Sequence, residues 1–411
     1  MRLTQSEPYV SAAMRHCHNA RANEGETWPK SLDTVLASTL IDDAVDEISR
    51  WPGYHPTPLI ALKSLADELG VAGVWYKDEA PRFGLGSFKA LGGAYAVMCL
   101  LRRILTSKHG KPVDTDAIRK GEYRPETRDI TVATATDGNH GRSVAWGAQQ
   151  FGCRCMIYIH AEVSEGRKSA MEAFGAEVIR VAGNYDESVR QAAADAAERG
   201  WHIVSDTSYP GYTELPQLVM AGYGLMVDEA LDQLPPGQPP THVFVQGGVG
   251  GLPAAVCARF WQRLGKRRPR TVIVEPDQAD CLYRSALHQK PVAVHITQES
   301  IMAGLSCGEV SQLAWDILHR GAHDFITIED RLIAPTMRAL AEGTVGAAPL
   351  VGGESGVAGL AALIAVGSDP SLAGVLGLDS GSRILLLGTE GATDPEIYRD
   401  LVGRAAETIA G

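Results

Sequence analysis

The chain has few of the features that mark secreted, membrane-spanning or nucleic-acid-binding proteins. Its seven cysteines are an odd number without CxxC spacing, which argues against a disulfide scaffold and a zinc site. No run approaches the roughly 18 apolar residues of a membrane span, and the amino-terminal stretch lacks the layout of a signal peptide. With 38 Lys and Arg against 49 Asp and Glu, the net charge of -11 argues against a nucleic-acid partner. We expect a cytoplasmic protein that binds small molecules, without metal or membrane.

What is present is the pattern of an α/β protein. The 411 residues are 45% hydrophobic, enough for two packed domains or one large divided one. From about residue 129, short β-branched runs alternate with helical stretches, and most of the runs are apolar throughout, as expected for a parallel sheet covered by helices on both faces. The expected strands lie at 129–135, 153–160, 177–183, 201–207, 241–246, 270–276, 324–330 and 382–391.

Two other stretches bear on the domain organisation. The Pro and Gly cluster LPPGQPP at 234–240 separates two alternating blocks, so it is a candidate crossing between domains. The first 60 or so residues lack this alternation. The segment HPTPLIALKSLADELG is expected to be helical in its second half, and the residues before that helix are expected to be extended on the surface.

The segment THVFVQGGVGGLPAAV predicts a phosphate site. A strand runs directly into Gly247, Gly248, Val249, Gly250 and Gly251 and then into a helix. Glycines let consecutive backbone N–H groups turn toward one point, and the helix adds its positive end. The alternative is a tight turn, which two glycines would satisfy. The dinucleotide fingerprint and the P-loop signature do not fit, which indicates a smaller phosphate ligand.

One lysine, Lys89, stands in the stretch GLGSFKALGGAY among glycines and small apolar residues. It could be a surface lysine near the start of a helix. The following helix has a long small and apolar face, however, so Lys89 is expected where burial begins. A partly desolvated amine is more readily neutral and nucleophilic. A nucleophilic lysine and a phosphate loop in one α/β chain together predict pyridoxal 5'-phosphate as cofactor.

Two further loops follow strand ends and hold polar residues. TATDGNHGRS carries Asp137, Asn139 and His140, and SDTSYPGYTELP carries Asp206 together with two tyrosines. Asp, Asn, Pro and Gly are common turn residues, so a purely structural loop is the competing interpretation for both segments. His140 is expected to pack within its loop rather than to act as a base.

Four segments in order resemble a known family: HPTPLIAL, VWYKDEAPRFGLGSFKALGGAYA, TATDGNHGRSVAWGAQQFG and VQGGVGGLPAAV. They are similar to those of the tryptophan-synthase-β-like, fold type II family of pyridoxal-phosphate enzymes, over residues 50–395. The resemblance implies a homodimer whose chain has two mostly parallel, three-layer α/β domains, the small one inserted into the large one. We expect the large domain at 1–90 and 225–411 and the small domain at 91–224.

The resemblance also implies roles for individual residues. Lys89 would form the Schiff base with the cofactor, the loop Gly247 to Gly251 would bind its phosphate, and Asn139 would contact its ring hydroxyl. Thr389 matches the position of the family's Ser or Thr that faces the pyridine nitrogen. A hydroxyl there does not favour a protonated ring, which suits elimination over transamination.

Within the family, the chain looks most like enzymes that release ammonia from 2,3-diaminopropionate. The features are Asp137 where hydroxy-amino-acid dehydratases usually carry Ser, the segment DTSYPGYTELPQLVMAGYG, and TEG near the end. The resemblance then implies Lys89 as base for the L-enantiomer and Asp137 for the D-enantiomer. Asp206 is the candidate partner of the β-ammonium, with Asp137 as competitor. One departure is Gly86-Ser87, where those lyases commonly read Asn-Ala.

Other interpretations stay open at this point. A threonine or serine dehydratase would share Lys89 and the glycine loop, and a non-catalytic pyridoxal-phosphate protein or a β-replacement synthase would too. Glu354, in GGESG, matches a family segment near the cofactor or caps the next helix. Cys281 and Cys307 fall in segments that the family places near the site entrance, where a regulatory disulfide is conceivable.

Overall fold

The computed structural model describes residues 2–22, 25–136 and 138–409. Contacts between Cα atoms divide the chain into two compact units. The large unit comprises Met1–Ser38, Pro56–Gly86 and Met226–Gly411, and the small unit comprises Thr39–His55 and Ser87–Leu225. Residues 39–55, expected in the large domain, therefore pack in the small unit. The Pro and Gly cluster at 234–240 lies inside the large unit, so it is not the crossing between the two units.

Within its described residues the large unit is built on a seven-stranded sheet in the order β1-β10-β9-β8-β11-β3-β2. The edge pairs β1 with β10 and β2 with β3 are antiparallel, and the pairs between them are parallel. The sheet is thus mostly parallel, as expected. Its strands are β1 (Arg15–His18), β2 (Leu59–Ala61), β3 (Gly73–Asp78), β8 (His242–Gln246), β9 (Arg270–Pro276), β10 (Asp324–Ile328) and β11 (Arg383–Gly388).

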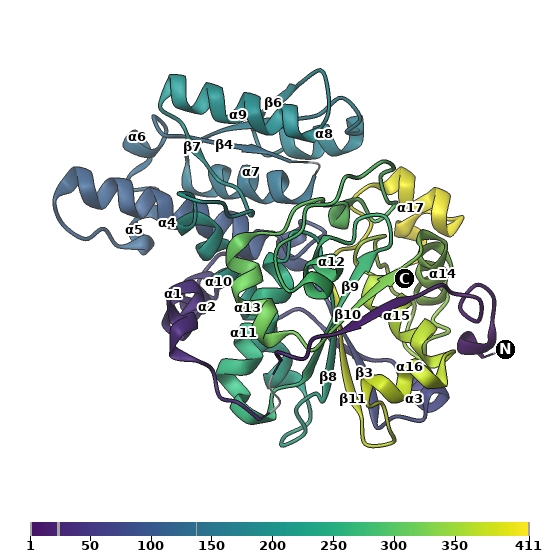
Figure 1. Ribbon diagram of the computed structural model, residues 1–411. Helices are drawn as coiled ribbons and strands as arrows, with labels where there is room; N and C mark the ends of the chain where they lie inside the picture. Colours follow the sequence, from purple (N-terminus) through teal and green to yellow (C-terminus); the bar gives the residue numbers. More distant parts are fainter. Residues whose placement is uncertain (1, 23–24, 137, 410–411) are drawn as a thin grey trace. The chain divides into compact units, whose positions relative to one another are not determined.

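Helices cover both faces of this sheet, which explains why its central strands are apolar throughout. α15 (Ala358–Gly367) packs across β8 to β11, and α11 (Gly251–Leu264) with α13 (Gln312–Gly321) lies on the other side (Figure 1). The other helices of this unit are α1 (Asp33–Leu36), α3 (Lys63–Leu69), α12 (Cys281–His288), α14 (Ile333–Ala341), α16 (Pro370–Leu376) and α17 (Pro395–Val402).

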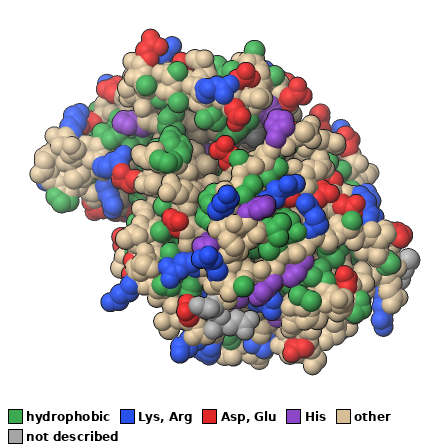
Figure 2. All heavy atoms as spheres, in the orientation of Figure 1, with side chains coloured by type: hydrophobic (Ala, Val, Ile, Leu, Met, Phe, Trp, Pro, Cys, Tyr) green, Lys and Arg blue, Asp and Glu red, His purple; other side chains and the backbone are tan. Residues whose placement is uncertain are grey.

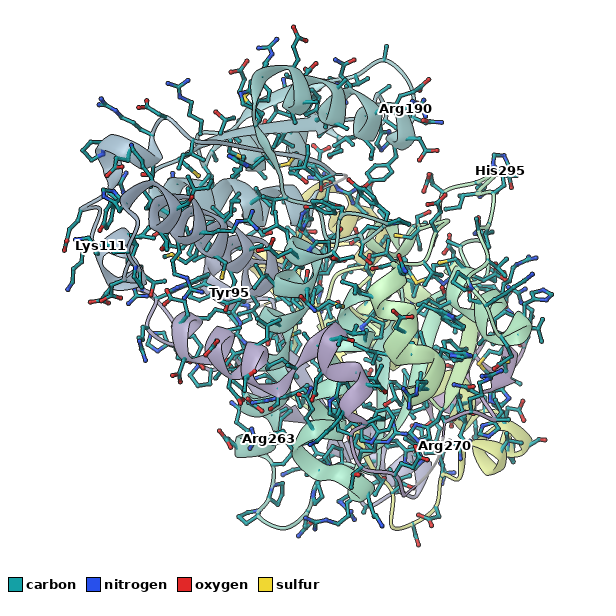
Figure 3. The ribbon with its side chains drawn as sticks, turned by 60° about the vertical axis from the view of Figure 1, so that its left-hand side comes forward. Tyr95, Lys111, Arg190, Arg263, Arg270 and His295 are labelled. Atoms are coloured by element: carbon teal, nitrogen blue, oxygen red, sulfur yellow. The ribbon has the colours of Figure 1, made fainter. Side chains whose placement is uncertain are left out.

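The small unit repeats this layering around a parallel sheet of four strands in the order β6-β5-β4-β7. α9 (Tyr185–Arg199) packs on one face, and α7 (Asn139–Phe151), backed by α4 (Ala90–His109), packs on the other. Tyr95 lies on α4 (Figure 3). The remaining elements are β4 (Thr131–Ala135), β5 (Arg154–Ile159), β6 (Glu177–Arg180), β7 (His202–Ile203), α2 (Ser38–Ile48), α5 (Thr115–Arg119), α6 (Arg124–Thr127), α8 (Glu165–Glu172) and α10 (Glu214–Gln233), which continues into the large unit.

The strands predicted from residue 129 onward are all present. β1, β2 and β3 were not predicted; β1 has the polar sequence RHCH, and β3, GVWYKD, ends in two charged residues. β1 is an edge strand whose histidines bind a buried carboxylate, and β3 carries a lysine buried in an ion-pair network. In both strands, polar side chains with specific partners stand where the other strands carry apolar residues.

Acidic and basic side chains are interspersed on the face shown in Figure 2. In the part of the chain that the structure describes, no single helix is long and apolar enough to cross a membrane. The pair α15 and α16 passes that test together but is bent by 115°.

Candidate active site

Lys89 lies where a glycine-rich turn of the large unit leads into α4 of the small unit. The turn needs left-handed backbone at Phe83, Gly84 and Gly86, with φ of 51°, 70° and 76°. Lys89 itself takes the N-cap position of α4 with helical φ and ψ. Its side chain is 22% exposed, so the expected partial burial is present.

The amine of Lys89 is paired with the carboxylate of Asp206. Lys89 Nζ lies 2.7 Å from Asp206 Oδ2, although 117 residues separate them in the chain. Burial raises the pKa of Asp206, but the charges of Lys89 and His140 and the hydrogen bond from Lys89 outweigh it and hold the pKa well below its usual range. Asp206 is therefore an anion at neutral pH. It stabilises the protonated form of Lys89, which counteracts the effect of burial.

His140 is buried beside the same carboxylate. Its Nε2 lies 2.9 Å from the carbonyl oxygen of Val204, so this nitrogen must carry the hydrogen, and its Nδ1 lies 3.7 Å from Asp206 Oδ2. Burial lowers the pKa of His140 despite the opposing charge of Asp206. His140 is thus the packing residue that its loop predicted, and it also contacts a candidate catalytic group.

A hydrogen-bonded turn supports the backbone before Asp206. The hydroxyl of Tyr212 donates to the carbonyl oxygen of Ile203 and accepts from the N–H of Ser205, each at 2.9 Å. Tyr212 and Tyr209 pair through both of their backbone hydrogen bonds and stack their rings 5.0 Å apart. The YPGY sequence therefore makes a closed turn that fixes the loop carrying Asp206.

Two other site residues, Asn139 and Asp137, were expected in this unit. Asn139 is the first residue of α7. Asp137 lies outside the described residues.

The glycine loop of the large unit joins β8 to α11, as predicted. Gly248 and Gly250 have φ of 65° and 99°, a region that favours glycine, and Gly250 is the N-cap of α11. A Cβ at Gly247 would lie 2.6 Å from Glu275 Cγ, so a side chain there would clash. The backbone at Val249 is held by the N–H of Ser311 at 2.9 Å. This cradle and the start of a 14-residue helix fit a phosphate.

Thr389 lies at the same edge of the same sheet. It follows β11, which runs parallel to β8, so Thr389 and the glycine loop both lie at the carboxyl ends of neighbouring strands. Gln246, the last residue of β8, donates to Thr389 Oγ1 at 3.3 Å and to the carbonyl oxygens of Gly356 and Leu387 at 2.7 Å each. A phosphate cradle beside a buried hydroxyl fits pyridoxal phosphate. Sequence reasoning missed Gln246, whose only signal is a polar residue ending an apolar strand.

Two glutamates lie near Thr389. Glu390 Oε1 accepts the N–H of Ser355 at 2.9 Å, so its carboxylate is engaged in holding the neighbouring GGESG segment. Glu354 is buried at 1% exposure. The N-cap residue of α15 is Val357, whose side chain makes no capping hydrogen bond.

Behind the glycine loop, Glu275 and two cysteines lie close together. Glu275 accepts the N–H groups of Leu282 and Tyr283 at 2.9 and 2.6 Å. The Cys281 thiol lies 3.7 Å from both Glu275 Oε1 and the carbonyl oxygen of Gly248. Cys281 and Cys307 are both free thiols in this structure.

Comparison of the chain with known proteins agrees with these features. The family described as "Pyridoxal-phosphate dependent enzyme" matches residues 50–387. The chain belongs to this family. The expected α/β fold and the cofactor of the family are thereby confirmed.

Within the family the chain is similar to diaminopropionate ammonia-lyase of Escherichia coli (strain K12), with 40% identity over 362 residues, 87% of this chain and 90% of that protein. The crystal structure of the E. coli enzyme with an aminoacrylate-PLP azomethine reaction intermediate matches with a TM-score of 0.84 and 38% identity, covering 95% of this chain and 97% of that chain. Its complex with D-serine matches with a TM-score of 0.86 and 38% identity, over 96% and 98%.

Proposed function

We propose that this protein is a pyridoxal-phosphate-dependent carbon-nitrogen lyase that converts 2,3-diaminopropionate and water to pyruvate and two ammonia. The observation that carries the proposal is the contact between Lys89 and Asp206 at 2.7 Å. It puts a permanent carboxylate beside the candidate base, and a carboxylate suits a substrate with a second positive charge. The similarity to diaminopropionate ammonia-lyase over most of both chains supports the same reaction.

We propose that Gly247, Gly248, Val249, Gly250 and Gly251 hold the phosphate of the cofactor, Lys89 attaches it, Asn139 contacts its ring hydroxyl and Thr389 faces its ring nitrogen. When bound, the cofactor supplies an electron-withdrawing ring that acidifies the α-carbon of an amino acid. Gln246 supports this arrangement, because its hydrogen bonds hold Thr389 to the strand that ends in the glycine loop.

The proton transfers fall to Lys89 and Asp137. Nζ of Lys89 takes the α-proton of the L-enantiomer, and the carboxylate of Asp137 takes that of the D-enantiomer from another side of the substrate. Deprotonation of Lys89 must precede its action as a base. Asp206 favours the ammonium form, so after proton abstraction it stabilises Lys89 as the holder of the proton.

Asp206 binds the β-ammonium of the substrate. An amine leaves readily only when it departs protonated, and an adjacent anion keeps it so. Because the pKa of Asp206 is held well below its usual range, this carboxylate stays charged at working pH and acts by binding rather than by donating a proton. A hydrogen bond to a charged group is worth about 1.5–3 kcal/mol, on the order of 10- to 150-fold in rate if it is made in the transition state.

The alternative is a threonine or serine dehydratase, which uses the same lysine and glycine loop on a hydroxyl leaving group. A hydroxy amino acid has no second charge for Asp206 to bind, so that contact favours the diamino substrate. A non-catalytic pyridoxal-phosphate protein is the more remote alternative and would have no use for the carboxylate of Asp206 beside the lysine.

We also propose a homodimer in the cytoplasm. The resemblance to the family supports the dimer, and light scattering on the purified protein tests it. All seven cysteines are free, which suits a reducing compartment.

The test of function is the release of ammonia and pyruvate by the purified yellow protein from L- and D-2,3-diaminopropionate, L-serine and L-threonine. We expect both diaminopropionate enantiomers to be the best substrates, with two ammonia formed per pyruvate. Faster turnover of serine or threonine would show that the protein is a dehydratase. A yellow protein that turns over none of the four amino acids would support the non-catalytic role in binding pyridoxal phosphate.

The two-base account makes its own prediction. Asp137→Asn should lower turnover of D-diaminopropionate by about 10² to 10⁴ and leave the L-enantiomer much less affected, because Lys89 still serves it. Asp129→Asn, at an exposed aspartate before β4, is the matched control and should change neither rate. Equal losses on both enantiomers in Asp137→Asn would contradict separate bases.

A further inference from the structure

Tyr223, on α10, is a buried tyrosine beside the candidate base. It is 1% exposed, and its ring lies 4.7 Å from the ring of Phe88, the residue before Lys89. Its hydroxyl oxygen is buried and makes no hydrogen bond of regular geometry within the described part of the chain, but it lies close enough to the side chain of Lys89 for a hydrogen bond to lower its pKa. Buried polar groups are nearly always satisfied, so this hydroxyl requires an explanation.

The charges nearest to this hydroxyl are Lys89 and Asp206. Burial raises the pKa of Tyr223, Lys89 lowers it and Asp206 raises it, so the two members of the ion pair both lie within electrostatic reach. The net pKa stays above the usual value, and the phenol is neutral at working pH. A neutral phenol oxygen can accept a hydrogen bond without adding a charge.

The chain makes room for this ring through a glycine. A Cβ at Gly92 would lie 2.6 Å from Tyr223 Cε1 and 2.8 Å from Cζ, much closer than atoms can approach. Gly92 is three residues after Lys89, in the first turn of α4. Because Gly92 has no side chain, the ring of Tyr223 on α10 can pack against the first turn of α4, close to Lys89 in the sequence.

We propose that Tyr223 is a positioning residue for Lys89, whose hydroxyl oxygen accepts a hydrogen bond from the free, protonated amine and so directs it together with Asp206. This role rests on the proposed function of Lys89 as a base. A second carboxylate in this place would hold the proton too tightly for release. A phenol oxygen orients the amine and adds no charge that would trap its proton.

The surroundings of Lys89 support a shared hold on its amine. Asp206 Oδ2 accepts at 2.7 Å, the ring of Phe88 lies 5.4 Å from Nζ, and Nδ1 of His140 lies 3.7 Å from the same oxygen of Asp206. Tyr223 adds a neutral acceptor to this set. The amine of Lys89 is free before the cofactor is attached to it. It is free again after the substrate has displaced Lys89 from the cofactor.

Tyr223→Phe tests the role because it removes only the oxygen. In the full-length chain stripped of cofactor, the pH dependence of Lys89 acetylation by acetic anhydride is followed by peptide mass spectrometry, with the exposed Lys111 as internal reference. Loss of an acceptor for the ammonium should move the acetylation midpoint of Lys89 to lower pH by about half a unit or more. In the holoenzyme, kcat should fall about fivefold with KM within twofold.

Tyr398→Phe is the matched control. Tyr398 is also fully buried with a hydroxyl that has no partner among the described residues, and the charge acting on its pKa is that of Arg404. Tyr398→Phe should be at least as thermostable as the wild type, because it removes an unsatisfied hydroxyl. Gly92→Ala, which displaces the ring of Tyr223, should shift the Lys89 midpoint in the same direction as Tyr223→Phe.

A Lys89 midpoint that is unchanged in Tyr223→Phe, or that shifts equally in Tyr398→Phe, overturns the proposal and leaves the hydroxyl a packing feature. The acetylation readout needs no substrate. If the midpoint shifts as expected while the wild type makes no pyruvate from diaminopropionate, the positioning role stands and the proposed substrate is wrong.

Discussion

Two lysines twelve residues apart are both withdrawn from solvent, yet their surroundings differ. Lys77, in β3 of the large unit, is 0% exposed, and its amine contacts three acceptors: Glu229 Oε2 and the carbonyl oxygen of Thr57 at 2.6 Å each, and Gln233 Oε1 at 2.9 Å. An ammonium has three hydrogens, so each has an acceptor. Lys77 is a structural cation.

Lys89, in the small unit, is 22% exposed and forms an ion pair with one carboxylate, that of Asp206. Arg82 also binds the carboxylate partner of Lys77, Glu229, through two contacts of 2.8 Å, so the charge of Lys77 belongs to a larger buried network. The comparison shows that burial alone does not mark a reactive lysine. The two lysines differ in the access of solvent to the side chain, which is 0% exposed in Lys77 and 22% exposed in Lys89.

The largest expected effect separates the two lysines directly. Lys89→Ala should lower pyruvate formation on the order of 10⁴-fold, because the base and the point of cofactor attachment are both lost. Its unfolding midpoint should stay near that of the wild type, because a partly exposed side chain is removed. Lys77→Met should show the reverse, with lower stability and near-normal kcat in the folded fraction. A Lys77→Met protein that folds normally but is inactive would break the comparison.

The next effect concerns the network around Lys77. Glu229→Gln leaves two buried cations, Lys77 and Arg82, with less negative charge than they require, and we expect the free energy of unfolding to fall by about 3–5 kcal/mol. Denaturant titration measures this loss. Asp46→Asn, which removes an exposed surface pair with Arg50, should cost less than about 1 kcal/mol. Equal losses in the two variants would show that the buried network contributes no more than a surface pair.

The smallest expected effect, counted per pH unit, is on the pH dependence of stability. It concerns Glu275, a buried carboxyl group with no cation among its described partners. Burial raises its pKa from 4.5 to about 8. Between these values the folded protein binds more protons than the unfolded chain, so its stability falls as the pH rises through this window. Glu275→Gln should flatten the fall by on the order of 1 kcal/mol per pH unit, as measured by unfolding at pH 5, 6, 7 and 8. An unchanged slope would mean that Glu275 is ionised throughout.

The sequence predicted the parts of the site that depend on local pattern. The strand, glycines and helix around Gly248 follow each other directly, so this loop can be read along the chain, whereas Thr389 was expected only from the resemblance to the family. The pairing of Lys89 with Asp206 could not be read in this way without a family to compare, because 117 residues lie between them and only the fold brings them together.

Other features escaped prediction for physical reasons. Lys77 and Lys89 each follow an aromatic residue in the sequence, and the difference in their exposure appears only in the fold. Residues 39–55 belong to the small unit although they precede the start of its main segment by more than thirty residues. Tyr223 occupies an ordinary helical position, and the space that Gly92 leaves for its ring is visible only in three dimensions.

The most direct test of the account compares kcat/KM for L-2,3-diaminopropionate and L-serine in the wild type and in Asp206→Asn. We expect the wild type to prefer the diamino acid, and Asp206→Asn to lose about 10- to 150-fold on it and clearly less on serine, because only the diamino acid presents an ammonium to the carboxylate. An Asp206→Asn enzyme that keeps its full preference for diaminopropionate would contradict the assignment of Asp206 and the substrate argument built on it.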